Sequence, residues 1–156
     1  MTKKLYIVIF VMLTGLLSAQ NSLIRMPKIS PNAQEMAFSY QGDIWTYHFS
    51  TQQTKRITIH EGYESNPVWN TSGNKIAFSS NRKGANNIFT VKKNGGTPKQ
   101  LTYYPTTDTP YNWTSSNHIV FATTRVLKGP EWDEQIYSVN ASGGTPQRFI
   151  TALGSM

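Results

Sequence analysis

The residues that could carry chemistry in this chain do not fall into the spacings of the common catalytic and metal-binding motifs. The three histidines, His48, His60 and His118, form neither an H-x-x-x-H pair nor an H-E-x-x-H frame, so their spacing does not indicate a shared metal ion. We interpret them as strand or turn residues. The chain of 156 residues has no cysteine, which excludes a disulfide framework, a thiolate metal site and a cysteine nucleophile.

Acidic side chains gather in one segment, at Glu131, Asp133 and Glu134. Such a group could bind Ca²⁺ or act as an acid–base pair, but no D-x-D-x-D-G frame accompanies it, and we interpret the segment as a solvated loop. Serines are numerous, yet none lies in the G-x-S-x-G frame that exposes a nucleophile. We expect no catalytic residue, no metal ligand and no cofactor in this chain. No motif in the sequence indicates which residues bind a ligand.

The net charge of +7 is not concentrated in a basic stripe. Lysines and arginines are scattered from Arg25 to Arg148, and no RNA- or DNA-binding motif accompanies them. We interpret them as solvated strand and turn positions and expect no nucleic-acid partner.

Residues 1–19 have the layout of a secretory signal peptide: Lys3 and Lys4, an apolar run over residues 5–17, then small residues before Gln20. The run is shorter than the roughly 20 residues that span a bilayer as a helix. We predict cleavage after Ala19 and an exported mature protein, periplasmic or secreted, with no stable membrane anchor; an uncleaved anchor is the alternative. No cysteine follows the run, which excludes a lipoprotein anchor.

The chain after residue 26 contains a pattern of strand segments that occurs three times, and this repeat determines where the side chains lie. Three strand segments line up in each copy: residues 36–40, 76–80 and 119–123; residues 43–47, 87–91 and 135–139; and residues 55–58, 99–102 and 147–150. A short segment that begins with proline leads into each copy, at residues 27–30, 67–70 and 110–114.

The spacing of the copies indicates the fold class. Ile44 precedes Ile88 by 44 residues, and Ile88 precedes Ile136 by 48. A period of about 40–50 residues with four short strands per copy is the signature of a β-propeller blade. The 8 Tyr, 7 Phe and 4 Trp, with only 15% charged residues, also suit short strands better than helices. We therefore predict an all-β fold of three four-stranded antiparallel propeller blades.

Alternation and turn residues agree with this prediction. Ile76 and Phe78 are expected on one face of the central blade, and Ala77 and Ser79 on the other. The segments 94–96 (NGG) and 142–144 (SGG) supply the residues with positive φ that tight hairpin turns need. Pro98 and Pro146 then fall at the start of the outer strand, where a missing N–H is tolerated.

The central copy, residues 70–102, resembles the WD-like blade repeat of the translocation protein TolB and of tricorn-type proteases. The first copy keeps residues 29–31, 37–39 and 42–45 of that pattern, and the third keeps 120–122, 136–139 and 143–146. The turn aspartate of the family is replaced by Asn32, Ser72 and Ser115, of which Asn32 can form the same bond to the backbone. The resemblance covers residues 23–150.

A narrower resemblance is carried by residues 23–31, 38–45 and 108–113 (DTPYNW), which look like the N-terminal propeller of exported tricorn-like serine proteases. In those proteins a C-terminal serine peptidase domain does the chemistry. The resemblance implies a propeller that gates substrates or binds peptide or protein ligands, with catalysis in a domain absent from this chain. A non-catalytic periplasmic protein-binding propeller of the TolB kind is the alternative, and a prolyl-oligopeptidase-like propeller is a third.

The expected organisation is a signal peptide at 1–19, a lead-in at 20–26, blades at 27–66, 67–109 and 110–150, and the start of a further blade at 151–156. Propellers typically close with 4–8 blades, so three blades indicate an incomplete propeller, the N-terminal fragment of a longer polypeptide. On that hypothesis the missing C-terminal domains are partners of this chain. The alternative is a homo-oligomer, in which two three-bladed chains close one ring.

Overall fold

The computed structural model describes residues 23–125 and 135–149, which form an all-β fold. The described strands make three antiparallel sheets of four strands each, as predicted. The predicted signal peptide at 1–19, the acidic group Glu131, Asp133 and Glu134, and the segment 151–156 lie outside the described residues.

Each sheet is built from four strands that follow one another along the chain. Sheet 1 contains β1 (Arg25–Ile29), β2 (Glu35–Tyr40), β3 (Asp43–His48) and β4 (Gln53–Arg56). Sheet 2 contains β5 (Glu64–Trp69), β6 (Lys75–Lys83), β7 (Ala85–Lys92) and β8 (Lys99–Gln100). Sheet 3 contains β9 (Asp108–Trp113), β10 (His118–Thr123), β11 (Gln135–Asn140) and β12 (Gln147–Arg148).

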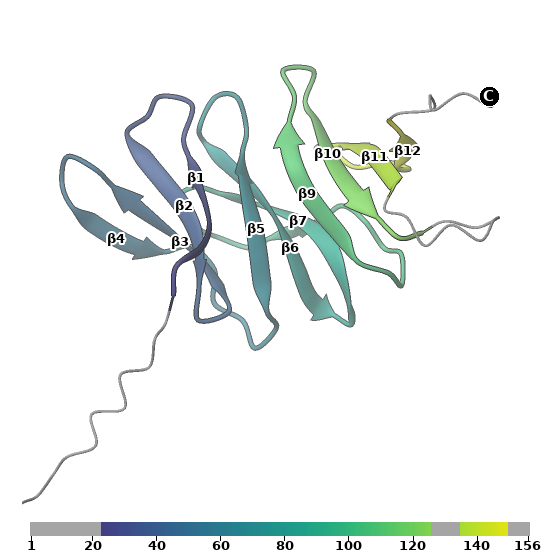
Figure 1. Cartoon of the computed structure of the whole chain (residues 1–156), viewed down its shortest axis with the longest axis horizontal. Helices are drawn as coiled ribbons and strands as arrows, with labels where there is room; N and C mark the ends of the chain where they lie inside the picture. Colours follow the sequence, from purple (N-terminus) through teal and green to yellow (C-terminus); the bar gives the residue numbers. More distant parts are fainter. Residues whose placement is uncertain (1–22, 126–134, 150–156) are drawn as a thin grey trace, which may run out of the picture.

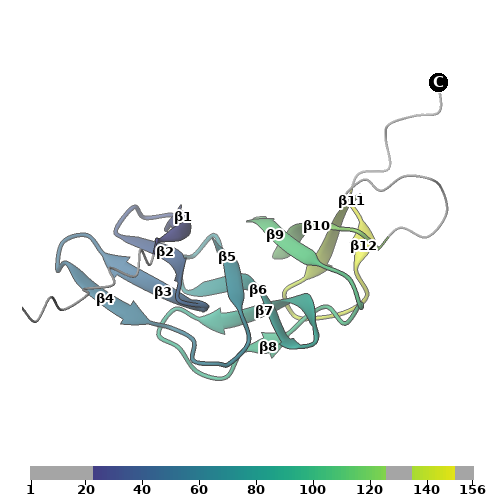
Figure 2. The same ribbon diagram turned by 60° about the horizontal axis from the view of Figure 1, so that its bottom comes forward.

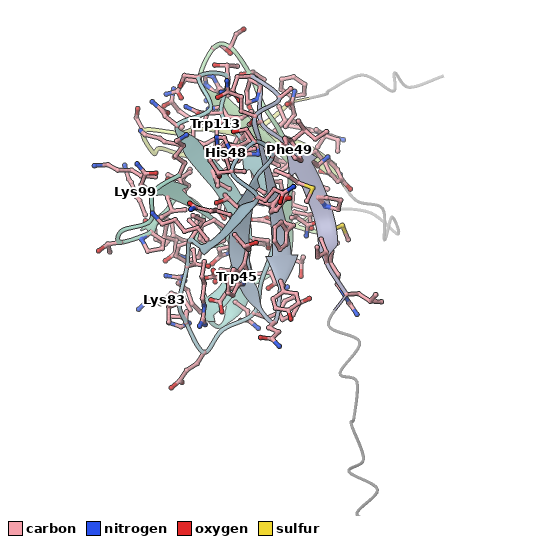
Figure 3. The ribbon with its side chains drawn as sticks, turned by 90° about the vertical axis from the view of Figure 1, so that its left-hand side faces the viewer. Trp45, His48, Phe49, Lys83, Lys99 and Trp113 are labelled. Atoms are coloured by element: carbon pink, nitrogen blue, oxygen red, sulfur yellow. The ribbon has the colours of Figure 1, made fainter. Side chains whose placement is uncertain are left out.

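The three sheets stand side by side in chain order, like blades around an axis (Figure 1). Strand β1 packs beside β5, and β5 packs beside β9, so the first strand of each sheet is its inner strand. In Figure 2 these inner strands lie along the upper side, and the outer strands β4 and β8 lie along the lower side. Figure 3 looks at sheet 1 from the side away from sheet 2, with Trp45 toward one end of β3 and His48 and Phe49 toward the other.

Two apolar cores hold the sheets together, one at each junction. Between sheets 1 and 2 lie Ala37, Ile44, Ile57, Trp69, Ile76, Phe78, Phe89 and Val91. Between sheets 2 and 3 lie Val68, Ala77, Ile88, Leu101, Trp113, Ile119, Phe121 and Val139. The predicted alternation is confirmed, because Ile76 and Phe78 face sheet 1 while Ala77 faces sheet 3. Ser79 also faces sheet 3, where its hydroxyl donates to the carbonyl oxygen of Asp108 at 2.8 Å.

At one point in each pairing, the inner strand has one extra residue relative to the strand beside it. In sheet 2, Ser65 pairs with Ser79 and Val68 pairs with Ala77, so three steps along β5 match two along β6. Sheets 1 and 3 show the same kind of shift in β1 and in β9. Such a bulge bends the strand and takes the extra residue out of the hydrogen-bond ladder.

The prolines of the inner strands lie inside the strands, which corrects the sequence-based expectation. The segments that lead into the copies were placed at 27–30, 67–70 and 110–114, each beginning with proline, but the inner strands begin two or three residues earlier, at Arg25, Glu64 and Asp108. Pro27 and Pro67 lie within the shifted stretch, and Pro110 lies at its edge. A bulge tolerates proline because a residue outside the ladder needs no N–H to donate.

The outer strands β8 and β12 have only two residues each. In sheet 2, a threonine that follows β8 adds a hydrogen bond to β7. The backbone N–H of Ile88 donates to the hydroxyl of Thr102 at 2.9 Å, and the N–H of Leu101 donates to the carbonyl of Ile88 at 2.8 Å. Sheet 1 has the same bond, from the N–H of Ile44 to the hydroxyl of Thr58 at 2.9 Å.

The glycine turns before the outer strands have the predicted conformation. Gly95 and Gly96 have φ of 89° and 117°, and Gly143 and Gly144 have φ of 107° and 120°. Residues with a Cβ atom are strained in this region, which explains the use of glycine at both turns.

Candidate ligand-binding site

A pocket of about 350 Å³ lies where the three inner strands end, and we call it the inner-strand pocket. Its lining residues come from all three sheets: Lys28, Ile29, Pro31, Val68, Trp69, Thr71, Tyr111, Asn112 and Trp113. The volume falls in the range typical of small-ligand sites, which is about 300–1,000 Å³.

The repeat explains why these residues meet. Ile29, Trp69 and Trp113 occupy the same position in the three copies, at or next to the last residue of the inner strand. Lys28, Val68 and Asn112 occupy the position before it. Because the inner strands lie side by side, equivalent positions of successive blades converge on one place.

Two tryptophans form the floor of the inner-strand pocket. Trp69 is 6% exposed, and its indole N–H donates to the carbonyl oxygen of Lys28 at 2.9 Å, which links sheet 2 to sheet 1. Trp113 is 4% exposed, and its indole N–H donates to the side-chain oxygen of Asn117 at 3.1 Å. A buried tryptophan whose N–H is satisfied presents a rigid apolar surface.

The rim of the pocket is more exposed and more polar. Tyr111 is 49% exposed, and Lys28 and Asn112 are also exposed. Ile29 is 63% exposed and adds an apolar side chain to the rim. The pocket therefore combines apolar and aromatic surface with one cation and several hydrogen-bonding groups, an arrangement that suits peptide side chains and backbone.

The free edges of the inner strands are poor templates for an added strand. Each of the inner strands contains a bulge and one proline, Pro27, Pro67 or Pro110. Bulges and prolines on an edge weaken pairing with another chain. These edges therefore suit recognition through side-chain contacts better than strand addition.

Buried ion pairs fix the start of two inner strands. Glu64 and Asp108 are fully buried, and each pairs with an arginine at the end of the neighbouring strand, Arg82 and Arg125 respectively. Both arginines also donate Nε–H to a hydroxyl, of Ser80 at 3.2 Å in sheet 2 and of Thr123 at 3.1 Å in sheet 3.

Sequence reasoning missed these ion pairs, although a signal was present. An acidic residue at the start of an inner strand is followed by arginine 18 residues later in sheet 2 and 17 residues later in sheet 3. Sheet 1 departs from this arrangement, since its ion pair joins Asp43 of β3 to Arg56 of β4.

The residues first considered for chemistry stay apart. The ring of His48 contacts the hydroxyl of Ser50, the ring of His60 accepts from the N–H of Gly62, and the ring of His118 contacts the carbonyl of Ser116. Within residues 23–125 and 135–149, no group of three His, Asp or Glu side chains is arranged to hold a metal ion. The described part of the chain also contains no helix that is long and apolar enough to cross a membrane.

Comparison with known proteins finds the same architecture. Residues 21–155 match the family described as the tricorn protease N-terminal beta propeller domain. An uncharacterized peptidase of Bacillus subtilis, YuxL, is 26% identical over 98 residues, which are 62% of this chain and 15% of that protein. Tricorn protease homolog 1 of Streptomyces coelicolor is 24% identical over 107 residues, which are 68% of this chain and 10% of that protein. The chain thus spans only a small part of these relatives.

Solved structures show the likeness of fold. A putative TolB from Agrobacterium tumefaciens has a TM-score of 0.67 at 22% identity, over 78% of this chain and 47% of that one. The tricorn protease crystal structure has a TM-score of 0.68 at 16% identity, over 82% of this chain and 13% of that one. At these identities the likeness identifies the fold alone.

Proposed function

This chain belongs to the family of tricorn protease N-terminal β-propeller domains, and from that membership we propose that it binds peptide or protein segments in the service of a peptidase. On this proposal the propeller binds and guides the substrate, and hydrolysis occurs in another domain. The observation that carries the proposal is the inner-strand pocket, where equivalent residues of three blades converge.

The chemistry of the inner-strand pocket supports a peptide ligand. Trp69 and Trp113 offer apolar surface, while Lys28, Thr71 and Asn112 offer groups that hydrogen-bond to a peptide backbone or a carboxylate. A ligand held in this pocket contacts the ends of the inner strands of all three sheets.

The peptidase part of the proposal rests on relatives and not on residues of this chain. An uncharacterized peptidase and a tricorn protease homologue are 26% and 24% identical to parts of this chain, and the solved tricorn protease has a similar fold. We also propose that the protein is exported, which is supported by the basic and apolar layout of residues 1–19.

Peptide binding to the chain of 156 residues tests the proposal. A pool of short unstructured peptides is mixed with the chain, the bound peptides are identified by mass spectrometry, and the best is titrated by calorimetry. We expect Tyr111→Ala to raise the Kd about tenfold, because Tyr111 is an exposed aromatic residue at the pocket rim.

Tyr103→Ala is the matched control, since Tyr103 is 75% exposed and does not line the inner-strand pocket. Equal weakening by both substitutions would overturn the proposed site. Cleavage of the peptides by this chain would contradict the division of labour. Binding of a folded protein without binding of any peptide would replace the proposal by the protein-binding alternative.

A further inference from the structure

A second hollow lies at the junction of sheets 2 and 3, and we call it the lysine groove. It has a volume of about 370 Å³, and three lysines line it, Lys75, Lys92 and Lys99. Asn117, Ala141 and Ser142 face them from the side of sheet 3. The lysine groove shares no lining residue with the inner-strand pocket.

Two of these lysines are direct cross-strand partners. Lys75 of β6 pairs with Lys92 of β7 in the register of sheet 2, and both are exposed. Lys99 is the cross-strand partner of Thr90, which lies two residues before Lys92 and therefore on the same face of the sheet. Like charges directly opposite each other destabilise a sheet, so this arrangement costs folding free energy.

The groove contains no compensating acid among its lining residues. The ammonium group of Lys99 donates to the carbonyl oxygen of Ser142 at 2.6 Å, which holds it across the junction. Asn117 and Ser142 add amide and hydroxyl groups that can donate hydrogen bonds.

The junction of sheets 1 and 2 shows which residues the repeat places at the equivalent positions. Glu35 stands where sheet 2 has Lys75, and Lys93 stands where sheet 3 has Ala141. These two residues form an ion pair across the junction, with 2.8 Å between Lys93 Nζ and Glu35 Oε1. At the second junction the acid is replaced by a lysine and the long side chain by a methyl group, which leaves both space and unpaired positive charge.

We propose that the lysine groove binds a small polyanion with phosphate or carboxylate oxygens. Three ammonium groups and the donors of Asn117 and Ser142 surround a space that holds such a group. Lysine recognises an anion mainly as a point charge, so phosphate and carboxylate groups share the chemistry that this site selects. The bound anion offsets the repulsion between Lys75 and Lys92 and links sheet 2 to sheet 3.

The test uses the chain of 156 residues, with inorganic phosphate and citrate as probes at constant ionic strength. Calorimetry measures the Kd of each probe, and thermal unfolding measures whether the probe raises Tm. Saturable binding of either probe, with a rise in Tm, is expected, since a ligand that binds only the folded state stabilises it. Binding of one probe alone identifies the anion class, and binding of neither overturns the proposal.

Variants locate the site. Lys75→Glu and Ala141→Glu each place a carboxylate in the lysine groove, and each is expected to raise the Kd at least about tenfold. Both are expected to raise Tm in the absence of the probes, because a carboxylate now faces the remaining lysines. The control is Lys83→Glu, an equal change of charge at the opposite end of β6, which is expected to leave the Kd within about twofold.

Lys83 and Lys99 project at clearly different heights of the molecule in Figure 3. Equal loss of binding in Lys83→Glu and Lys75→Glu would show a general effect of charge and would overturn the site. Should Lys75→Glu fail to fold, Ala141→Glu decides the question, because Ala141 is a partly buried turn residue beyond the end of β11, so this substitution leaves the sheet register intact.

Discussion

Arg125 shows how single residues hold the inner strands in place. Its guanidinium donates to both carboxylate oxygens of Asp108, at 2.7 and 2.6 Å, and lies 5.2 Å from the ring centres of Phe121 and Tyr137. One side chain thus joins the start of β9 to the end of β10 and covers the aromatic core of sheet 3. Arg82 performs the same role in sheet 2, where it lies over Phe89.

Arg125→Leu is expected to lower the free energy of unfolding by about 3–5 kcal/mol, because it leaves the fully buried Asp108 without its charge partner. Denaturant unfolding measures the loss. Replacing Asp108 by leucine in the same chain is expected to recover part of it, since no unpaired buried charge then remains. A loss no larger than that of Arg148→Leu, at an exposed position of β12, would contradict this role.

At the residue scale the sequence predicts which face of a strand a side chain occupies better than it predicts which charged side chains form ion pairs. The faces of Ile76, Phe78 and Ala77 follow from a period of two, and the structure agrees. Asn32 also behaves as expected, accepting a hydrogen bond from the N–H of Gln34 at 3.2 Å. The ion pair of Asp108 and Arg125 was missed because each residue looks like an ordinary surface charge until the hairpin brings them together.

At the scale of elements, the hydroxyl of Thr102 helps to hold the segment after β8 against β7. Thr102 is fully buried and accepts from the N–H of Ile88. Thr102→Val keeps the shape but leaves that N–H without an acceptor, and we expect a loss of about 1–3 kcal/mol in the free energy of unfolding. Thr51→Val, at an exposed turn position, is the control and should change stability by less than about 0.5 kcal/mol. Similar losses in both variants would contradict the importance of this bond.

The bulge of β5 gives a second prediction at this scale. Asn66 lies in the bulge with φ of 53°, a conformation that asparagine adopts more readily than most residues. Asn66→Gly should leave stability nearly unchanged, whereas Asn66→Val should lower the free energy of unfolding by about 1–2 kcal/mol, measured by chemical denaturation. Equal stability of the two variants would show that the bulge does not constrain this residue.

The existence and order of the strands could be predicted from the sequence, but the bulges could not. The sequences of β2, β3, β6 and β7 alternate with a period of two, so each of them predicts which of its residues share a face. Proline at positions 27, 67 and 110 marked the segments that lead into the copies, but whether a proline opens a strand or lies in a bulge depends on the pairing with the partner strand. The inner-strand pocket was not predicted for a related reason, since it forms only when equivalent positions of three blades meet.

At the scale of the molecule, the chain is a row of similar sheets joined by similar junctions. Each junction has an apolar core with one tryptophan, one alanine and more than one isoleucine, the lysine groove lies at the second junction, and the pocket lies where the inner strands of all three sheets end. The strand pattern is thus shared among the blades, while the residues that line the two hollows differ in type from one blade to the next.

Hydrogen–deuterium exchange of the chain of 156 residues, with and without a saturating bound peptide, tests the central claim most directly. The account predicts slower exchange at residues 28–31, 68–71 and 111–113, which line the inner-strand pocket, and an intact peptide at the end of the experiment. Slower exchange confined to the outer strands β4, β8 and β12, or cleavage of the peptide by this chain, would contradict it.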